Sequence, residues 1–197
     1  MTTTEDAKNA LRARARETRR AVHRAQAREA AAAVRAHWRE AAEQGLVVTP
    51  GTPVAGYWPV RDEFDVRGLL ADLAAVGADV ALPAIAAPDR PLVFRRWQPG
   101  DVLANGALGI AEPSADRRAV VPHVLIVPLL AFDRAGYRLG MGRGYYDRTL
   151  RVLRAGAPVV AVGVAFAAQE VAEVPHDGFD ERLDWIVTER GARRLGG

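Results

Sequence analysis

The chain has 197 residues, of which 49% are hydrophobic and 26% charged, with a net charge of +3 and no cysteine. This length fits one domain, which we expect over residues 1–197, and the lack of cysteine excludes disulfides and thiolate sites. The longest apolar runs are far shorter than the ~20 residues needed to cross a bilayer. We therefore expect a soluble, cytoplasmic protein with no membrane partner.

The basic residues leave several ligand classes open. Lys8 is the only lysine, so arginine supplies nearly all of the 27 basic side chains. Such a balance is typical of a solvated surface, of a site for an anion such as phosphate or a carboxylate-bearing cofactor, or of a nucleic-acid surface. The basic residues of 12–39 are interleaved with Ala and Glu, and no series of aromatic residues accompanies them. We therefore expect no nucleic-acid partner.

The first expected element is a long helical region over residues 5–44. It is rich in Ala, Arg, Glu and Gln, which favour helix. Thr4 is the expected N-terminal cap, and two acidic residues of the first turn favour the helix dipole. The apolar stripe is incomplete and allows a break near Thr18 to His23, and Gly45 is the expected stop.

From residue 53 the pattern predicts alternating strands and helices. Strands are expected at 54–60, 80–85, 92–97, 120–132, 159–166 and 184–188, helices at 66–76 and 144–153, and a short helix or turn at 169–171. The run over 120–132 is almost continuously apolar, as expected of a central strand covered on both faces. The alternation predicts a layered α/β sheet. Ligands bind such sheets at the carboxyl ends of the strands.

A glycine-rich segment, 127–147, gives the strongest indication of a binding site. Its glycines at 136, 140, 142 and 144 let the backbone approach a ligand closely, and successive N–H groups of such a loop can bind an anion. The helix that follows adds partial positive charge at its start. Arg138 and Arg143 supply donors for phosphate, and Asp147 is placed where a carboxylate can hold Mg²⁺.

The segment matches neither common phosphate-binding motif. It lacks the Gly-Lys-Ser/Thr of the P-loop, and Tyr145 stands where the third glycine of the dinucleotide motif falls. No nucleophile elbow is present, and His23, His37 and His123 have no metal-ligand spacing. The residues alone therefore leave open a phosphate site and a purely structural connection.

Taken as a whole motif, the segment resembles the 5-formyltetrahydrofolate cyclo-ligase family, also called methenyltetrahydrofolate synthetases. The resemblance rests on the string Pro-x-x-Ala-Phe-Asp-x-x-Gly-x-Arg-Leu-Gly-x-Gly-x-Gly-Tyr-Tyr-Asp, from Pro128 to Asp147. Further segments resemble the family at 8–12, 57–65, 92–97, 109–113, 176–177 and 183–189, so the resemblance covers roughly residues 8–189.

This resemblance implies a fold and an activity. The fold is a three-layer α/β domain with a mainly parallel sheet, helices on both faces and a long N-terminal helical region. The activity is ATP- and Mg²⁺-dependent cyclisation of 5-formyltetrahydrofolate, with or without a polyglutamate tail, to 5,10-methenyltetrahydrofolate, with release of ADP and phosphate. In the implied mechanism ATP phosphorylates the formyl oxygen and N10 attacks the activated carbon. We expect such an enzyme to act as a monomer.

Carried over to this sequence, the family's sites fall on three sets of residues. The ATP set is Lys8, Arg12, Arg138, Leu139, Gly140, Met141, Gly142, Arg143, Gly144, Tyr145 and Tyr146. The folate set is Trp58, Glu63, Met141, Gly142, Arg143, Gly144 and Tyr145, and the metal set is Asp147 and Asp184. Many family members carry Gly or Lys at the position of Arg143, which leaves open whether its guanidinium contacts phosphate or the folate tail.

Two other functions stay open on the residues. One is a different enzyme that handles ATP or a phosphosugar on a related α/β fold. The other is a non-catalytic module that binds a nucleotide or nucleic acid. Turnover of ATP that depends on 5-formyltetrahydrofolate distinguishes an enzyme from a binding module.

Overall fold

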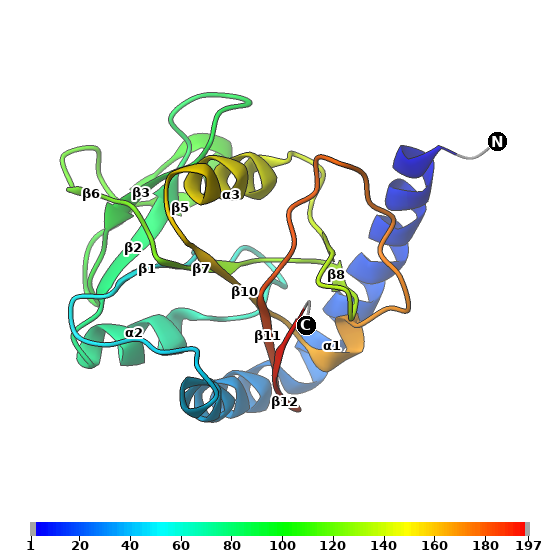
Figure 1. Ribbon diagram of the computed structural model, residues 1–197, viewed down its shortest axis with the longest axis horizontal. Helices are drawn as coiled ribbons and strands as arrows, with labels where there is room; N and C mark the ends of the chain where they lie inside the picture. The colour runs from blue at the N-terminus through cyan, green and yellow to red at the C-terminus, as the bar shows by residue number, and fades with distance from the viewer. Residues whose placement is uncertain (1–2, 196–197) are drawn as a thin grey trace.

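An eight-stranded sheet forms the centre of the molecule, and the computed structural model describes residues 3–195. The strands follow in the order β12-β11-β10-β7-β1-β2-β3-β6 (Figure 1). They span β1 (Pro53–Ala55), β2 (Asp79–Ala84), β3 (Val93–Arg96), β6 (Ala119–Val120), β7 (Val124–Val127), β10 (Val160–Val164), β11 (Trp185–Thr188) and β12 (Gly191–Arg194). The inner strands from β11 to β2 are parallel, whereas β12, β3 and β6 pair antiparallel. The predicted mainly parallel sheet is confirmed.

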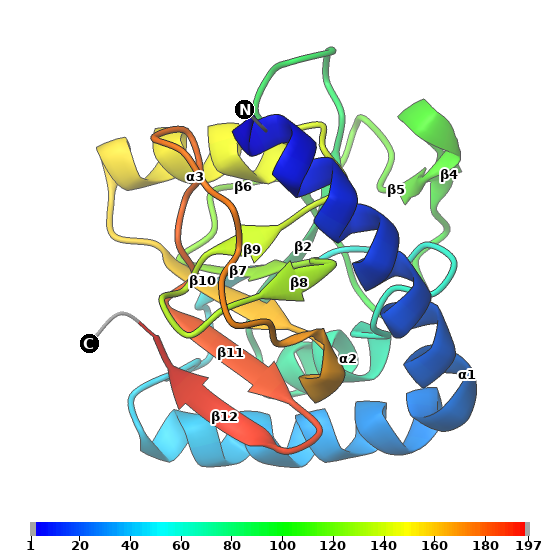
Figure 2. The ribbon, with the colours of Figure 1, turned by 90° about the vertical axis from the view of Figure 1, so that its right-hand side faces the viewer.

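Helices on both faces of the sheet complete three layers, as predicted. α1 (Thr4–Glu43) and α2 (Arg67–Ala75) pack on one face, and α3 (Tyr145–Gly156) packs on the other (Figures 1 and 2). None of the helices within residues 3–195 is long and apolar enough to cross a membrane.

The central strand β7 shows how the sequence specifies these layers. Val124 and Ile126 belong to the core beneath α1 and α2, whereas Leu125 and Val127 belong to the core that contains Leu150 of α3. Alternate residues of a strand point to opposite faces. A strand buried on both sides therefore needs an apolar residue at every position, which is the signal seen in the sequence.

α1 is continuous but not straight. Gln26 has non-helical backbone angles (φ −148°, ψ 20°), and the segments before and after it run in different directions (Figure 2). The first segment packs through Leu11 against the glycine-rich region, and the second packs through Trp38 against the sheet. The break lies three residues after the region Thr18–His23 near which the apolar stripe allowed it, because two different packing surfaces determine its place.

The N-terminal cap also differs by one residue from the expectation. The Thr3 hydroxyl accepts a hydrogen bond from the Asp6 N–H at 3.1 Å, and the Thr3 N–H donates to the Asp6 carboxylate at 3.0 Å. This reciprocal pair is a capping box. Thr3 is thus the cap, and Thr4, which we expected in that role, is the first helical residue.

Two expected strands are shorter than the apolar pattern indicates. β1 ends at Ala55 rather than at residue 60, and the run 120–132 is divided into β6, β7 and β8 (Ala131–Phe132). Pro122 and Pro128 separate these strands because proline has no N–H to donate to a ladder. β8 pairs with β9 (Arg138–Leu139) in a hairpin that leads into the glycine loop.

Several short elements have no clear sequence pattern. They are β4 (Ala104–Asn105), β5 (Ala111–Glu112), the 3₁₀ turn η1 (Ala107–Gly109) and the edge strand β12. The 3₁₀ turn η2 (Ala167–Gln169) lies next to the short helix or turn expected at 169–171. The expectation of one domain over 1–197 stays a prediction, and its ends, 1–2 and 196–197, lie outside the described residues.

Candidate active site

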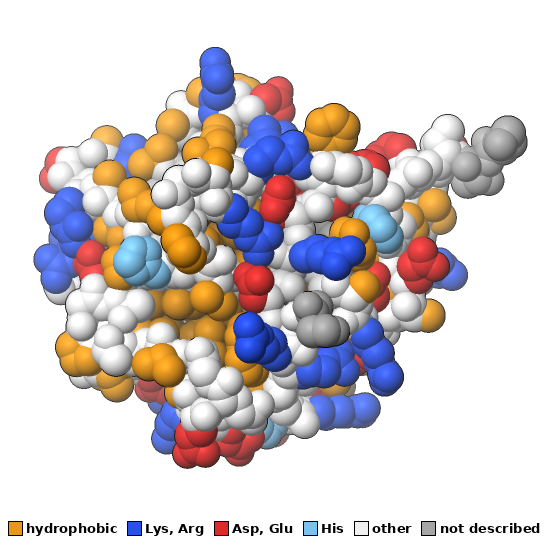
Figure 3. All heavy atoms as spheres, in the orientation of Figure 1, with side chains coloured by type: hydrophobic (Ala, Val, Ile, Leu, Met, Phe, Trp, Pro, Cys, Tyr) orange, Lys and Arg blue, Asp and Glu red, His pale blue; other side chains and the backbone are white. Residues whose placement is uncertain are grey.

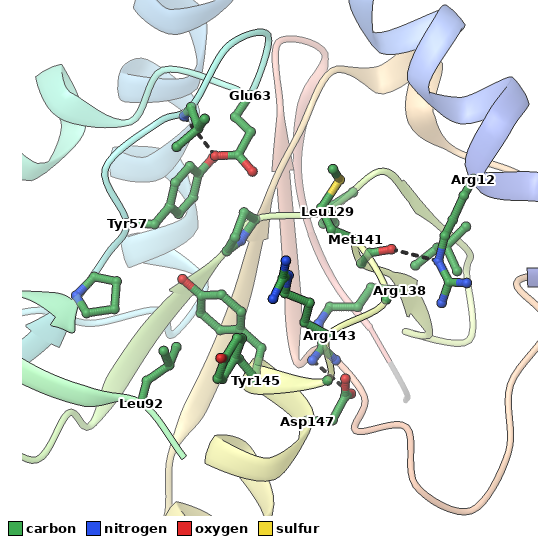
Figure 4. Close-up of a pocket in the computed structure, with 18 of the residues that line it drawn as sticks. Arg12, Tyr57, Glu63, Leu92, Leu129, Arg138, Met141, Arg143, Tyr145 and Asp147 are labelled. Atoms are coloured by element: carbon green, nitrogen blue, oxygen red, sulfur yellow. Dashed lines mark hydrogen bonds and ion pairs between the residues drawn. The ribbon is translucent and has the colours of Figure 1, made fainter. Parts of the chain in front are cut away.

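A cavity of about 990 Å³ opens at the carboxyl ends of the parallel strands (Figure 4). Its walls come from the N-terminal segment of α1, the loop 57–63 after β1, the ends of β2 and β7, the glycine loop 140–144 and the loop 177–180. This is the edge at which α/β sheets bind ligands. Every predicted site residue except Asp184 lines this cavity.

The glycine loop turns the chain from β9 into α3. Gly142 and Gly144 have φ of 95° and 64°, in the left-handed region that favours glycine. Gly144 is the cap residue of α3, and within residues 3–195 no side-chain hydrogen bond caps the start of that helix. Its first N–H groups therefore remain available to an anion.

Arg138 and Arg12 are both fixed by hydrogen bonds beside the glycine loop. Arg138 is buried; it donates to the Asp147 carboxylate at 2.9 Å and to the Glu181 carbonyl. Arg12 Nε donates to the Gly140 carbonyl at 3.2 Å, which joins α1 to the loop. Arg143, by contrast, is exposed. The two inner guanidiniums are thus fixed in place, whereas the outer one is free to meet a ligand.

Lys8 is buried and paired with two carboxylates. Its Nζ lies 2.6 Å from Asp180 Oδ2 and 3.0 Å from Asp177 Oδ2. Burial lowers the pKa of Lys8, but the hydrogen bonds to Asp180 and Asp177 outweigh burial and raise that pKa. The pKa of Asp177 is lowered by a hydrogen bond from the Phe179 N–H and by Lys8. The ammonium therefore stays charged and ties α1 to the loop 177–180.

The predicted folate residue Glu63 lies across the cavity from these cations. Figure 4 shows it beside Tyr57, with Asp147 on the opposite side. Its carboxylate is half-buried and accepts a hydrogen bond from the Val60 N–H at 2.9 Å. Burial raises the pKa of Glu63. Burial, and then the charge of Glu63, also raise the pKa values of Tyr57 and Tyr146. This side of the cavity is therefore poorly solvated.

Trp58 lines the same side. Its ring meets Trp97 edge to face, with centroids 6.1 Å apart, and the Arg67 guanidinium lies 5.5 Å from its ring centre. Trp97 is buried in the core beneath it. Trp58 is thus backed by packing on one side and borders the cavity on the other, as a stacking residue must.

Asp184 lies away from the cavity. It directly precedes β11, so it sits at the amino ends of the parallel strands. Its Oδ2 accepts hydrogen bonds from Arg154 at 2.8 Å and from the Ala161 N–H at 2.7 Å. The structure therefore separates the two predicted Mg²⁺ ligands.

Asp147 fits a magnesium ion that is shared with phosphates. It lines the cavity in the first turn of α3. Among residues 3–195 no group of three or more His, Cys, Asp or Glu is arranged to hold a metal ion. Such a cage is not required, because nucleotide enzymes hold Mg²⁺ through one or two carboxylates together with substrate phosphates and waters.

The sequence patterns missed several residues of the cavity wall. Arg19 is buried and donates to Asp62 at 3.1 Å and to the Leu129 carbonyl at 3.4 Å, so it joins α1 to the Glu63 loop. The other unpredicted wall residues include Pro83, Ile85, Leu92, Leu108, Ile110, Asp177, Phe179 and Asp180. The sequence features nearest to these wall residues are segments 109–113 and 176–177, which resemble the family but were not assigned to a site.

Comparisons with known proteins point to a single family. A sequence profile described as the 5-formyltetrahydrofolate cyclo-ligase family matches residues 4–189. The 5-formyltetrahydrofolate cyclo-ligase of Escherichia coli K12 is 37% identical over 140 residues, which cover 68% of this chain and 76% of that protein. The protein of the same name from Mycolicibacterium smegmatis is 34% identical over 154 residues, which cover 74% of this chain and 77% of that protein.

The fold leads to the same family. The NMR structure of Aquifex aeolicus 5,10-methenyltetrahydrofolate synthetase is 30% identical, with a TM-score of 0.77, and the match covers 96% of this chain and 93% of that chain. The agreement therefore extends beyond the glycine-rich motif to almost the whole chain. The chain belongs to the 5-formyltetrahydrofolate cyclo-ligase family.

Proposed function

We propose that the protein uses ATP and Mg²⁺ to cyclise 5-formyltetrahydrofolate to 5,10-methenyltetrahydrofolate, with release of ADP and phosphate. One observation carries the proposal: in a member of this family, one cavity brings the glycine loop and its arginines together with Glu63 and Trp58. The two ends of the cavity differ in the way the two substrates require. One end offers cations and N–H groups, and the other offers a carboxylate and aromatic rings.

The chemistry explains why a nucleotide is needed. The formyl group is an amide, and its oxygen is a poor leaving group. That oxygen attacks the γ-phosphorus of ATP, and the bond to ADP breaks. N10 then forms a bond to the activated carbon, the carbon–oxygen bond breaks, inorganic phosphate leaves, and N10 loses its proton. The protein's task is to align the two substrates and to stabilise the charge on the transferred group.

The phosphate end of the cavity is suited to that task. Arg138 is buried and held by Asp147, so its guanidinium is already ordered before a ligand arrives. Fixed donors in a poorly solvated site stabilise developing negative charge without reorganising. The loop Gly140–Gly144 and the start of α3 add backbone N–H groups. Arg143 is exposed at the rim, where it can reach either phosphate or the glutamate tail of folate.

Glu63 and Trp58 are proposed to hold the folate. The amino and ring N–H donors of a pterin match the two oxygens of a carboxylate, and Trp58 offers a ring face for stacking. Within residues 3–195, only one Glu63 oxygen has a hydrogen bond, from the Val60 N–H. Its second oxygen therefore has capacity for a pterin donor.

Asp147 is the residue proposed to hold Mg²⁺. The ion supplies charge neutralisation on the nucleotide phosphates when bound. Asp184 is paired with Arg154 outside the cavity, so the structure supports it less well in this role. Asp180 lines the cavity and is the better placed second carboxylate, although Lys8 binds it in the ligand-free protein.

The proposal extends to the setting of the enzyme. We propose that it acts as a monomer, and a cytoplasmic setting suits a chain without cysteine. Basic side chains on the face in Figure 3 are scattered among acidic and hydrophobic ones. This scatter favours a small anionic substrate over nucleic acid, and the folate is proposed to react with or without a polyglutamate tail.

An absorbance assay for the methenyl product tests this proposal. Purified protein should form the product from 5-formyltetrahydrofolate with one ATP consumed per turnover, because each formyl oxygen must be phosphorylated once. Omission of ATP, or chelation of Mg²⁺, should stop product formation. Conversion at an unchanged rate without nucleotide would exclude the proposed mechanism.

A further inference from the structure

Phe179 is an exposed aromatic side chain at the edge of the cavity. The residue as a whole is 73% exposed. Among residues 3–195 it is the only aromatic residue in the group of exposed large apolar residues. It nevertheless lines the cavity together with the glycine loop. An aromatic ring that is exposed in a cavity wall offers its face to a ligand.

The ring is held in place rather than carried on a loose loop. The Phe179 N–H donates to Asp177 Oδ1 at 2.8 Å, and the Asp177 N–H donates to Asp180 Oδ2 at 2.8 Å. Arg151 Nη2 donates to the Phe179 carbonyl at 2.9 Å, and the Arg151 guanidinium lies 5.4 Å from the ring centre. Phe179 thus stands on a hydrogen-bonded loop, and a cation–π contact with Arg151 supports its ring.

The position of the ring relates it to the proposed nucleotide site. Asp177 and Asp180, which flank Phe179 in sequence, both bind Lys8. Arg151 lies one helical turn beyond Asp147 on α3 and so shares its side of the helix. A nucleotide with its phosphates at the start of α3 therefore has Phe179 and Arg151 within the same cavity, next to the phosphate end.

We propose that Phe179, supported by Arg151, is the stacking surface for the purine base of the nucleoside triphosphate. The inference rests on the proposed use of ATP and adds the place of the base, which no motif of the sequence assigns. A phenyl face binds a base through its π-system. The Arg151 donors are engaged by Glu181 and by the Gly178 and Phe179 carbonyls, so this residue orders the ring rather than reading the base.

Two ligands distinguish a contact with the base from a contact with the phosphates. Dissociation constants for ATP and for inorganic tripolyphosphate would be measured by calorimetry with wild-type protein, Phe179→Ala and Phe179→Trp. Phe179→Ala should weaken ATP binding roughly 5- to 150-fold, the range for loss of one base–aromatic stack, and should leave tripolyphosphate binding unchanged. Phe179→Trp should retain ATP binding. Val102→Ala, which removes an 89% exposed apolar residue outside the cavity, is the matched control and should change neither constant.

The outcomes distinguish this inference from the proposed function. If Phe179→Ala binds ATP as wild type does, or loses ATP and tripolyphosphate equally, Phe179 does not stack on the base, whereas the proposed function stands. If wild-type protein binds neither ligand and makes no product, both proposals fail together. Because Phe179 is largely exposed, the alanine variant should fold, and circular dichroism checks this.

Discussion

At the scale of single residues, the Glu63 carboxylate lies in an environment that disfavours its charged form. Burial raises its pKa, and only the hydrogen bond from the Val60 N–H and the charge of Arg19 counteract that effect. A charged carboxylate without full hydrogen bonding is destabilising in a poorly solvated site. The proposed pterin would supply the missing hydrogen-bond donors. The burial of Glu63 that lowers the stability of the free protein would therefore favour the binding of folate.

Glu63→Gln should therefore stabilise the free protein and weaken folate binding. The raised pKa means that the penalty is absent below the ordinary Glu value of 4.5 and develops as the pH rises through the folded-state pKa. The free energy of unfolding in urea should thus exceed that of wild type at pH 7, and this gain should shrink as the pH falls towards 4.5. The KM for folate should rise by the equivalent of about 1.5–3 kcal/mol, and the KM for ATP should not change. A stability difference that grows on acidification would contradict the argument.

At the scale of elements, the bend in α1 decides which residues reach the cavity. The segment before Gln26 carries Lys8, Arg12 and Arg19, which bind the loop 177–180, the glycine loop and the Glu63 loop respectively. The segment after it packs on the sheet. One helix thus anchors the core with one half and holds three cavity loops with the other.

Within the segment before Gln26, Lys8 binds the carboxylates of Asp177 and Asp180. We predict that its ammonium leaves Asp177 and Asp180 in part to meet an ATP phosphate, as a point charge can. Lys8→Ala should then raise the ATP KM about tenfold, which corresponds to ~1.4 kcal/mol, and Lys8→Arg should restore only part of it. Arg14→Ala removes an exposed charge from the same helix outside this cavity and is the control. If the ATP KM of Lys8→Ala stays within about twofold of wild type at low salt, where a phosphate contact is strongest, Lys8 only holds α1 to the loop 177–180.

At the scale of the whole molecule, the cavity concentrates a modest positive charge. Nine arginines and Lys8 line it, against seven Asp and Glu side chains, so the wall carries an excess of three positive charges. The whole chain has the same net charge of +3. Both proposed substrates are anions, and a charged cleft attracts them over a distance set by the ionic strength.

ATP binding should consequently weaken with salt. Between about 0.1 and 1 M NaCl the Debye length falls from roughly 10 to 3 Å, and we expect the KM for ATP to rise about tenfold over this range, largely without a change in kcat. Thermal unfolding in the same buffers shows whether the fold is affected. Phe179→Ala should keep the same relative salt dependence, because stacking on a phenyl ring involves no net charge. A KM that does not respond to salt would mean that the wall charges are fully compensated by their ion pairs.

Features that depend on local chemistry can be predicted from the amino-acid sequence. Buried strands such as Val124–Val127 are apolar at every position because both faces are covered, and the glycines at 142 and 144 mark a loop whose backbone must adopt positive φ. The long glycine-rich string also identified the family, and with it all the cavity residues of the glycine loop. These features need only neighbouring residues for their explanation, so a pattern can reveal them.

Features that depend on distant partners became visible in the folded chain and not in its sequence. The bend at Gln26 has no proline or glycine to announce it, since it arises where α1 passes from one packing surface to another. Asp184 and Asp180 are four residues apart, yet one faces Arg154 at the amino ends of the strands and the other faces Lys8 in the cavity. Phe179 gains a candidate role only because Arg151 of α3 contacts its ring and Lys8 of α1 binds Asp177 in the same loop. Spacing along the chain carries no information about which end of a sheet a loop residue reaches, because the path of the whole chain sets that end.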